Sequence, residues 1–199
     1  TLSNNSGNVN ITGNTKITAN DEGDKAFAFD VCKYANYTEP VVTVAETVEI
    51  KGKVEAVAKI GNTYYATLPQ AVAAAKDGET VTLVNDAAGA GVVINKDITI
   101  DFDKHTYTFT DGVGSTGTPS NGFQILQGND VTLKNGTLNV AEESKGKFYI
   151  LVQNYADLTV EDMTLDGTNL DKWSDTDGDS YTLSNNSGNV NITGNTKIT

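Results

Sequence analysis

The sequence predicts an all-β fold, a parallel β-helix (a solenoid of stacked coils) with one short capping α-helix near residues 67–76. Three observations support this prediction: a strand motif that returns about every 30 residues, an 18-residue segment that occurs twice, and one stretch with helical periodicity. The first two observations indicate a solenoid, and the third indicates what covers one of its ends.

The strand motif is a polar residue followed by alternating apolar and polar residues, and its copies occupy residues 8–11, 42–44, 97–100, 130–133, 157–160 and 189–192. Alternation places the apolar side chains on one face of a strand. We therefore expect one such strand in each coil, with Ile, Leu and Val inside and Thr and Asp facing water. The equivalent residues recur after 27 to 33 positions, in the pairs Ile98 and Val131, Val131 and Leu158, Leu158 and Val190, and Val9 and Val42.

A second strand precedes the next motif in each coil, at residues 27–29, 123–126, 148–151 and 181–183. Stacked parallel strands lie about 4.8 Å apart and hydrogen-bond to the neighbouring coil. Amide side chains follow these strands, at Gln127, Asn154 and Asn186. Because an amide both donates and accepts hydrogen bonds, we expect these residues to bond to their counterparts one coil away.

The segment TLSNNSGNVNITGNTKIT occurs unchanged at residues 1–18 and 182–199, so that the sequence begins again at Thr182. Two interpretations fit: the native protein is an array of near-identical modules, each as long as the stretch from Thr1 to Tyr181, or the overlap was engineered. On the first interpretation, residues 1–56 are the C-terminal coils of one repeat, and residues 57–199 are the capping helix and the N-terminal coils of the next. The chain would then begin and end within a solenoid.

Residues 67–78 carry the signals of a short helix. The sequence Thr67-Leu68-Pro69-Gln70 is typical of a capping box, with Thr67 as the N-cap and Gln70 reaching back to it. We expect Gly78 to end the helix. An uncovered coil exposes strand edges, so we expect the helix to lie across the open end of a coil stack. Its apolar stripe consists of Leu68, Ala71, Val72 and Ala75.

A family resemblance enters at the same place in the chain. Residues 60–68, 71–72 and 77–83 resemble the opening of pectin-lyase-like β-helix modules in bacterial surface proteins, and residues 98–108 resemble the strand and turn that follow there. The resemblance covers roughly residues 57–199. It implies that the β-helix is right-handed and that the protein is extracellular, either secreted or on the cell surface. It implies no catalytic residues, because many such modules have none.

The charge of the chain excludes two classes of partner. The formal net charge is −12, and the sequence contains no arginine. Nucleic-acid binding needs a cationic surface for phosphate, so no nucleic-acid partner is expected. An anionic membrane surface is disfavoured for the same reason. The sequence also has no apolar run long enough to cross a bilayer, so we expect no membrane insertion of this segment.

A loop near the C-terminus is the candidate metal site. Asp175, Asp177 and Asp179 alternate around a glycine, and Ca²⁺ takes six to eight oxygen ligands from such carboxylates. The pattern departs from the EF-hand loop, because no glutamate follows at the right spacing. The spacing makes this loop a candidate calcium site, but the pattern favours a solvated acidic loop with Trp173 packed beside it. No other cofactor is expected.

Two further groups of polar residues have structural explanations. Asp101, Asp103 and His105 would project from one face of an extended strand, where they could bind a metal or act as acid and base. The alternative is a solvated strand face followed by a turn. Asp130, Asp157 and Asn189 share one position in successive coils, which indicates a ladder of turn residues.

Three functions follow from these features. The leading hypothesis is a non-catalytic stalk or fibre module of an extracellular tandem-repeat protein, whose partners are adjacent identical repeats, head to tail. The alternative is an adhesin module that binds a glycan or a host surface protein through the aromatic residues Tyr34, Tyr37 and Trp173. A polysaccharide lyase or hydrolase is the third, and it is disfavoured because a charge of −12 repels an anionic glycan.

Overall fold

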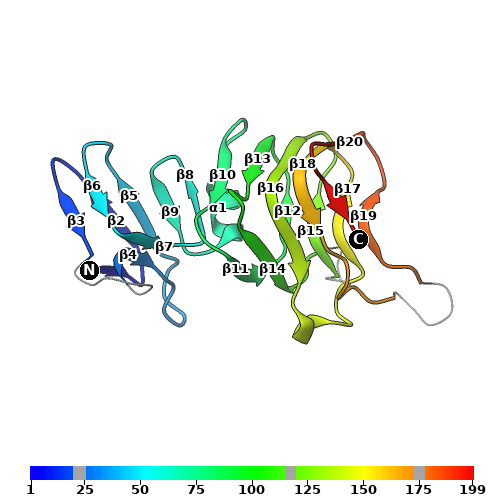
Figure 1. The fold of residues 1–199 in the computed structure, drawn as a ribbon, viewed down its shortest axis with the longest axis horizontal. Helices are drawn as coiled ribbons and strands as arrows, with labels where there is room; N and C mark the ends of the chain where they lie inside the picture. Colours follow the sequence, from blue (N-terminus) through cyan, green and yellow to red (C-terminus); the bar gives the residue numbers. More distant parts are fainter. Residues whose placement is uncertain (20–25, 115–119, 173–177) are drawn as a thin grey trace.

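The computed structural model describes residues 1–19, 26–114, 120–172 and 178–199, and it is a parallel β-solenoid of about six turns (Figure 1). A β-hairpin joins two stacks of coils. The N-terminal stack contains β1 (Leu2–Asn4), β2 (Asn8–Ile11), β3 (Lys16–Thr18), β4 (Phe27–Val31), β5 (Val41–Val44), β6 (Glu49–Lys51) and β7 (Lys53–Glu55). The hairpin is formed by β8 (Ala58–Ile60) and β9 (Thr63–Tyr65), and α1 (Leu68–Ala74) follows it.

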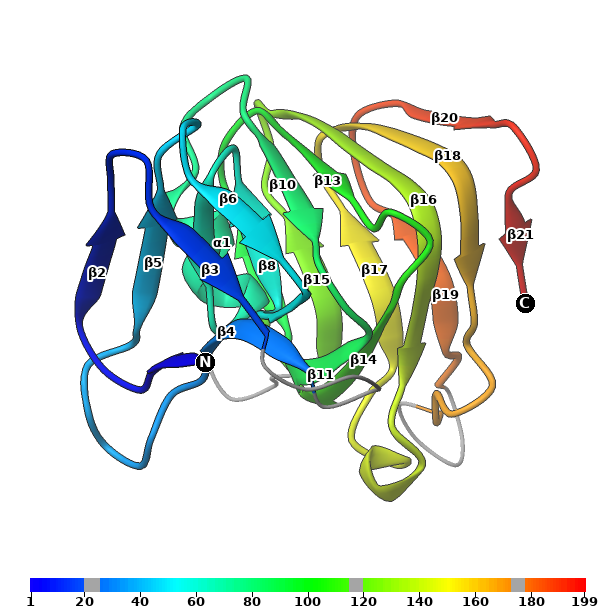
Figure 2. The ribbon, with the colours of Figure 1, turned by 60° about the vertical axis from the view of Figure 1, so that its left-hand side comes forward.

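The C-terminal stack holds the remaining strands and a short 3-10 helix, η1 (Glu142–Ser144). Figure 2 shows β10, β13, β16 and β18 side by side, with β15, β17 and β19 on another side of the solenoid. The strands are β10 (Thr80–Leu83), β11 (Ala87–Ala90), β12 (Val92–Ile94), β13 (Ile98–Asp101), β14 (Thr106–Asp111), β15 (Asn121–Ile125), β16 (Asp130–Val140), β17 (Ile150–Asn154), β18 (Asp157–Leu165), β19 (Tyr181–Asn185), β20 (Val190–Thr193) and β21 (Lys197–Ile198).

The predicted stacking of the strand motif is confirmed. Successive coils pair in parallel within each stack, and the register matches the spacing of the apolar residues. The buried members of these strands point inward, because alternate residues of a strand face opposite sides. The confirmed pairs are Ile98 with Val131, Val131 with Leu158, Leu158 with Val190, and Val9 with Val42.

The hairpin is the feature that the periodicity did not predict. It pairs antiparallel with β5 on one side and with β10 on the other, so the strands of the two stacks run in opposite directions. The signal in the sequence is the two-residue turn Gly61-Asn62 between short apolar runs, with Gly61 at a positive φ of 53°.

The two stacks have separate cores on opposite faces of this continuous sheet. Neighbouring residues of β9 divide between them: Tyr65 belongs to the core of the C-terminal stack, whereas Tyr64 packs against the core of the N-terminal stack. Val41 and Val42 of β5 divide in the same way. A reversed strand direction combined with a core on the opposite face corresponds to a rotation of about half a turn around the stacking axis. The hairpin is therefore a joint at which the interior changes sides.

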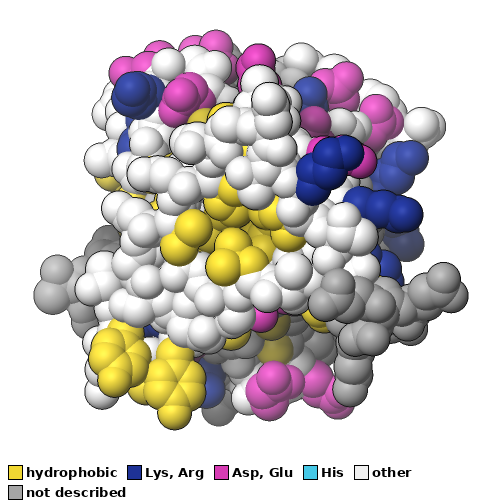
Figure 3. All heavy atoms as spheres, turned by 90° about the vertical axis from the view of Figure 1, so that its left-hand side faces the viewer, with side chains coloured by type: hydrophobic (Ala, Val, Ile, Leu, Met, Phe, Trp, Pro, Cys, Tyr) yellow, Lys and Arg dark blue, Asp and Glu magenta, His cyan; other side chains and the backbone are white. Residues whose placement is uncertain are grey.

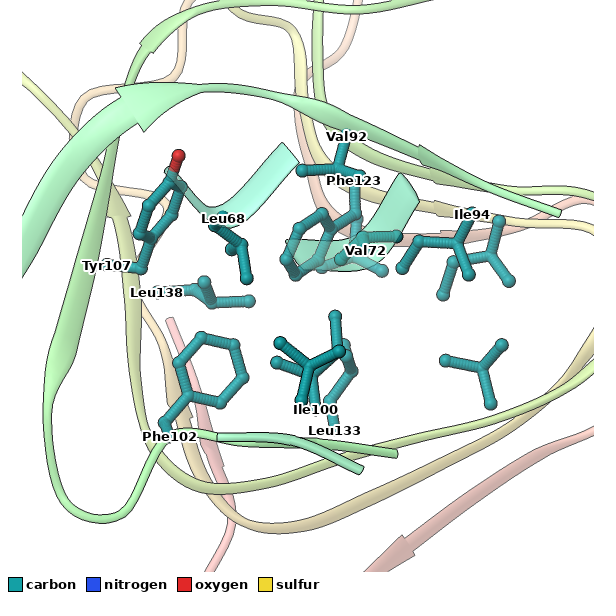
Figure 4. Close-up of a cluster of buried hydrophobic side chains, with 14 of the residues drawn as sticks. Leu68, Val72, Val92, Ile94, Ile100, Phe102, Tyr107, Phe123, Leu133 and Leu138 are labelled. Carbon is teal, nitrogen blue, oxygen red and sulfur yellow. The ribbon is translucent and has the colours of Figure 1, made fainter. Parts of the chain in front are cut away.

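The helix covers the open end of the C-terminal stack, as predicted. Figure 4 shows Leu68 and Val72 pointing from α1 into the interior, toward residues such as Phe123 and Leu138. Thr67 is the N-cap and accepts a hydrogen bond from the Gln70 amide at 3.2 Å. The Gln70 side chain reaches back to the Ala66 amide (3.1 Å) rather than to Thr67.

The helix is shorter than expected at its end. Its C-cap is Ala75, which is extended, so the helix stops before Gly78. The amide of Gly78 instead donates to the Asp97 carbonyl of the next coil at 2.7 Å. Of the helices in the described part of the chain, none combines the length and the apolar character needed to cross a membrane.

Candidate functional site

The exposed tyrosines predicted as ligand-binding residues form a pair. Tyr34 and Tyr37 lie in the loop between β4 and β5, 63% and 61% exposed, with ring centroids 6.0 Å apart and planes 22° from parallel. A turn brings them together: the Tyr37 amide donates to the Tyr34 carbonyl at 3.2 Å, and Ala35 has a positive φ of 50°. Two exposed rings in this arrangement offer an apolar surface against which a sugar ring or an aromatic side chain can pack.

Most of the predicted calcium loop lies outside the described residues, including Trp173, Asp175 and Asp177. Asp179 is described, and its Oδ2 accepts a hydrogen bond from the Tyr181 hydroxyl at 3.1 Å. This hydrogen bond, together with the negative charge of Asp179, raises the pKa of Tyr181. Within residues 1–19, 26–114, 120–172 and 178–199, no three His, Cys, Asp or Glu side chains converge to hold a metal ion. The calcium site stays a prediction.

The structure does not bring Asp101, Asp103 and His105 together. Asp101 lies 3.4 Å from the Lys134 ammonium and accepts hydrogen bonds from the Asn135 side chain and the Asp103 amide. His105 instead faces Asp86, with Nδ1 and Oδ1 3.3 Å apart. Because Asp101 and His105 have different partners, the alternative of a strand face followed by a turn describes this region.

The expected turn ladder is present between Asp157 and Asn189, and a similar bond joins Asp97 to Asp130, but the Asp157 amide donates to the Asn129 carbonyl rather than to Asp130. Asp97 Oδ1 accepts from the Asp130 amide one coil further on at 2.8 Å, and Asp157 Oδ1 accepts from the Asn189 amide at 3.0 Å. A shallow depression of about 400 Å³ runs beside the ladder, lined also by Gln127, Tyr155 and Ser187. The carboxylates bind backbone amides, which is a structural role that holds successive coils in register.

The amide ladder includes Asn154, as predicted, but not Gln127 or Asn186. The side chain of Asn154 is fully buried, and its Nδ2 donates to Asn185 Oδ1 at 2.8 Å, not to Asn186. It also donates to the Ala156 carbonyl at 2.8 Å. Gln127 lies two residues beyond the ladder, because the strand pairing aligns Ile125 with Asn154. A second amide group lies nearby, where Asn121 and Gln124 both donate to Gln153 Oε1.

The end coils are the remaining surface with unusual exposure of apolar side chains. Ile192 and Ile198 at the C-terminal end are 51% and 39% exposed, whereas equivalent positions in the interior of the stack are fully buried. At the other end, Leu2, Val9 and Ile11 are partly buried against the N-terminal core. In the inner coils of a solenoid the corresponding positions are covered by the next coil, which explains the difference in exposure.

Comparison with known proteins adds no relative: no family model, no curated protein and no solved structure matches this chain. The class of the molecule therefore rests on its own geometry, which is that of a parallel β-solenoid with one capping helix. The joint at the hairpin and the pairing of Tyr34 with Tyr37 are the surface features that the sequence did not reveal. The turn signal Gly61-Asn62 marks the hairpin in the sequence, whereas the turn at Ala35 has no comparable signal.

Proposed function

We propose that this chain is a non-catalytic structural module of an extracellular tandem-repeat protein, in which modules stack head to tail into a stalk. One observation carries the proposal: residues 1–18 and 182–199, identical in sequence, form the same three strands at opposite ends of the solenoid. The first copy pairs with the coil after it and the second with the coil before it. The extracellular location rests on the resemblance to surface modules.

The geometry gives this stalk a definite repeat. Along the sheet, β2 is separated from β20, its counterpart one module later, by the successive strands β5, β9, β8, β10, β13, β16 and β18. Eight strand spacings of about 4.8 Å amount to about 38 Å per module. Each hairpin joint adds a rotation of about half a turn, so equivalent surfaces of neighbouring modules face opposite sides of the stalk.

The test is a two-module chain, made by following residues 1–199 with a second copy of residues 19–199. Small-angle X-ray scattering should give a maximum dimension about 38 Å longer than that of the single chain, with the profile of a rigid rod. The single chain, measured at a concentration where it is monomeric, is the control. An increase much smaller than this, or a flexible two-bead profile, would sink the stalk proposal.

A second candidate function has its own supporting observation, the exposed Tyr34–Tyr37 pair. Binding of a glycan through this pair would make the module an adhesin rather than a spacer. A glycan array would detect such binding, with Tyr34→Ala and Tyr37→Ala removing it. Tyr181→Ala is the matched control, because Tyr181 is 47% exposed and stacks on no aromatic ring among the described residues. Absence of binding by the unsubstituted chain would leave the stalk as the better proposal.

We propose no catalytic role. The carboxylates that share a face of the solenoid accept hydrogen bonds from backbone amides, as Asp97 and Asp157 do. The buried hydroxyl beside the cap, that of Tyr107, donates to the Ala90 carbonyl at 2.9 Å, and burial raises its pKa above the ordinary value of a tyrosine. These carboxylates and this hydroxyl already make structural hydrogen bonds, which favours a structural role for them over acid–base catalysis.

A further inference from the structure

We infer that Asn36 is an asparagine-linked glycosylation site, at which an attached oligosaccharide packs on the exposed rings of Tyr34 and Tyr37. The inference goes beyond the stalk, and it rests on the proposed extracellular location, because this modification is made on chains that leave the cytoplasm. It identifies the ligand of the tyrosine pair as a sugar that belongs to the chain itself. The adhesin alternative instead gives the pair a sugar from outside.

The structure separates one acceptor motif from five others. The motif Asn-X-Ser/Thr, with any residue except proline at X, occurs six times in the sequence. Asn36 lies in the loop between β4 and β5, and an exposed loop is where this motif is modified in secreted proteins. The other five asparagines lie in strands, and they are Asn4, Asn10, Asn135, Asn185 and Asn191.

Three of the strand asparagines already use their amide nitrogen. Nδ2 of Asn4 donates to two backbone carbonyls, and Nδ2 of Asn185 donates to one. Nδ2 of Asn135 donates to a carboxylate oxygen at 3.1 Å. An attached sugar replaces one of the two amide hydrogens, so at these positions it competes with hydrogen bonds of the solenoid. Asn10 and Asn191 are exposed on their strands and are the competing acceptors.

The side chain of Asn36 is exposed and unused. It forms no hydrogen bond with the described residues, so its amide nitrogen is open to modification. Thr38, which supplies the hydroxyl of the motif, is exposed as well. The acceptor nitrogen and the hydroxyl that the motif requires are therefore both accessible in the folded chain.

The loop that carries Asn36 projects from the coils on anchored ends. The Tyr34 amide donates to the Asn5 carbonyl of the preceding coil at 3.2 Å, and the carbonyl of the buried Pro40 accepts from the Gln70 side chain at 3.2 Å. Figure 2 shows the connection from β4 to β5 extending beyond these two strands. The coil of β1, β2 and β3 precedes this loop, so the exposure of Asn36 does not depend on where the sequence begins.

The rings that flank Asn36 offer the first sugar a surface. The hydrogen bond from the Tyr37 amide to the Tyr34 carbonyl closes a turn whose central residues are Ala35 and Asn36. This turn holds the two rings 6.0 Å apart and nearly parallel on either side of Asn36 in the sequence. The C–H groups of a sugar ring pack against such an apolar surface. Because the sugar is tethered to Asn36, its effective concentration beside the rings is high.

The same rings form an apolar patch apart from the interior of the solenoid. Figure 3 views the molecule from its N-terminal side and shows an apolar group at the lower edge, separate from the apolar side chains in the middle. Among the described residues of the N-terminal stack, Tyr34 and Tyr37 are the large apolar side chains that are mostly exposed. Exposed apolar patches mark interaction sites, and the adjacent motif selects a tethered sugar as the partner.

The attachment step is a group transfer from a lipid-linked oligosaccharide phosphate, catalysed by an oligosaccharyltransferase. Nδ2 of Asn36 forms a bond to the anomeric carbon of the donor, and the bond from that carbon to the phosphate oxygen breaks. The lipid phosphate leaves with the electron pair, and one amide proton passes to a base of the transferase. The step involves no oxidation or reduction.

The first test supplies the folded, unmodified 199-residue chain with a purified oligosaccharyltransferase that reads Asn-X-Ser/Thr and with a lipid-linked oligosaccharide. Mass spectrometry of the digested chain locates the sugar. We expect transfer to Asn36, with little or none to Asn10 and Asn191. A peptide of residues 6–15 is the control, and it should accept the sugar because no strand restrains it. An unmodified Asn36, or equal transfer to Asn10 in the folded chain, would overturn the inference.

Substitutions of the motif hydroxyl separate recognition from folding. Thr38 is exposed and forms no hydrogen bond with the described residues, so Thr38→Ala should keep the fold and lose the sugar. Thr38→Ser keeps a hydroxyl and should restore transfer. Thr12→Ala is the matched control, because it removes the hydroxyl from the motif of Asn10 and should leave the modification unchanged. Transfer that persists in Thr38→Ala would contradict the assignment.

Urea denaturation tests whether the sugar packs on the rings. The denaturation midpoint of the glycosylated chain should exceed that of the unmodified chain, and this shift should disappear in Tyr34→Ala. Comparing the two forms of each variant removes the effect of the substitution itself. Tyr181→Ala is the control and should keep the shift, because Tyr181 lies in another strand, β19. An equal shift in Tyr34→Ala would show that the sugar is not the ligand of the pair.

These results are distinguishable from failure of the proposed function. The transfer is made on the purified chain, so a failure there cannot come from a wrong location. Scattering from the unglycosylated two-module chain tests the stalk without any sugar. If Asn36 stays unmodified and the unmodified chain binds free glycans through Tyr34, the pair belongs to an adhesin and the inference is wrong.

Discussion

The two stacks of this solenoid use the same strand motif but differ in how much supports each coil. The C-terminal stack has an interior that runs from Ala58 to Leu170 and includes the helix and five fully buried aromatic side chains, whereas the core of the N-terminal stack contains seven residues. Those seven are Ile17, Ala28, Phe29, Val31, Val42, Val44 and Ala56. Because each coil of a solenoid is stabilised by its neighbours, the smaller stack should depend on what it rests on.

The N-terminal stack rests on the hairpin formed by β8 and β9. The ring of Tyr64 on β9 meets Phe29 edge to face, with centroids 5.1 Å apart, and burial raises the pKa of Tyr64. The adjacent Tyr65 belongs to the larger core. One continuous sheet therefore serves two separate interiors. We expect the N-terminal stack to depend on the hairpin and the C-terminal stack for its stability more than the C-terminal stack depends on it.

Removing one ring from each core gives the largest expected effects. Phe29 and Phe123 are both fully buried, and truncating a buried Phe to Ala costs about 3–5 kcal/mol. We expect Phe29→Ala to increase amide exchange in residues 1–56 while residues 98–165 stay protected. Phe123→Ala should lower protection in both stacks, since the hairpin that supports the smaller one packs on the larger core.

Hydrogen exchange with mass spectrometry measures both effects on the folded protein. Val93→Ala, which truncates an exposed side chain of the larger stack, serves as the control. If the two Phe variants lose protection in the same residues and by the same amount, the solenoid unfolds as one unit and the distinction between the stacks is wrong.

Asparagine substitutions test the same difference between the two stacks, with smaller expected losses of stability. Asn154→Ala removes a fully buried side chain that bonds the carbonyl and amide of Ala156 as well as Asn185, so it should cost about 1–3 kcal/mol. Asn4→Ala removes two hydrogen bonds at the edge of the smaller stack, where water can replace them more readily. Urea denaturation should therefore show a larger loss for Asn154→Ala. An equal loss of stability would mean that the hydrogen bonds of Asn4 are shielded from water as well as those of Asn154.

Much of the stacking could be predicted from the sequence, because a one-residue slip would turn every apolar side chain outward. This constraint fixed Ile98 beside Val131 and Leu158 beside Val190. It does not extend through the corners between strands. The step along the chain from Asn154 to its partner Asn185 is shorter by one position than the step from Leu158 to Val190, because the corner after Asn185 holds one extra residue. That extra residue makes Asn185, and not the predicted Asn186, the partner of Asn154.

The sites were less predictable than the stacking, for reasons that also depend on local backbone. The stacking of Tyr34 on Tyr37 requires the turn at Ala35, where a non-glycine residue adopts a positive φ. The separation of Asp101 from His105 depends on partners from other coils, Lys134 and Asp86, which spacing along one strand cannot supply. The hairpin was missed because its strands are short and do not follow the repeat of about 30 residues.

The smallest expected effect concerns pH. We expect acid to loosen the last coil of the C-terminal stack before it affects the smaller N-terminal stack. Hydrogen bonds from the Thr168 hydroxyl and amide lower the pKa of Asp166, which lies just after β18 where that strand holds the end of the chain. A carboxyl whose pKa is lower in the folded state stabilises that state above its ordinary pKa. The contribution is lost as the pH falls through the lowered value.

Acidification should therefore loosen β21, which pairs with Thr164 and Leu165, before it affects residues 1–56. NMR titration should give Asp166 a pKa below its ordinary value, and amide exchange in β21 should rise over the same pH range. In Asp166→Asn the pH-dependent part of this change should disappear, while Asp179→Asn, which alters a carboxylate bonded to Tyr181, should retain it. The effect should be small, because the Asp166 side chain remains partly exposed to water. If β21 loosens at the same pH in Asp166→Asn as in the unsubstituted chain, protonation elsewhere controls the last coil.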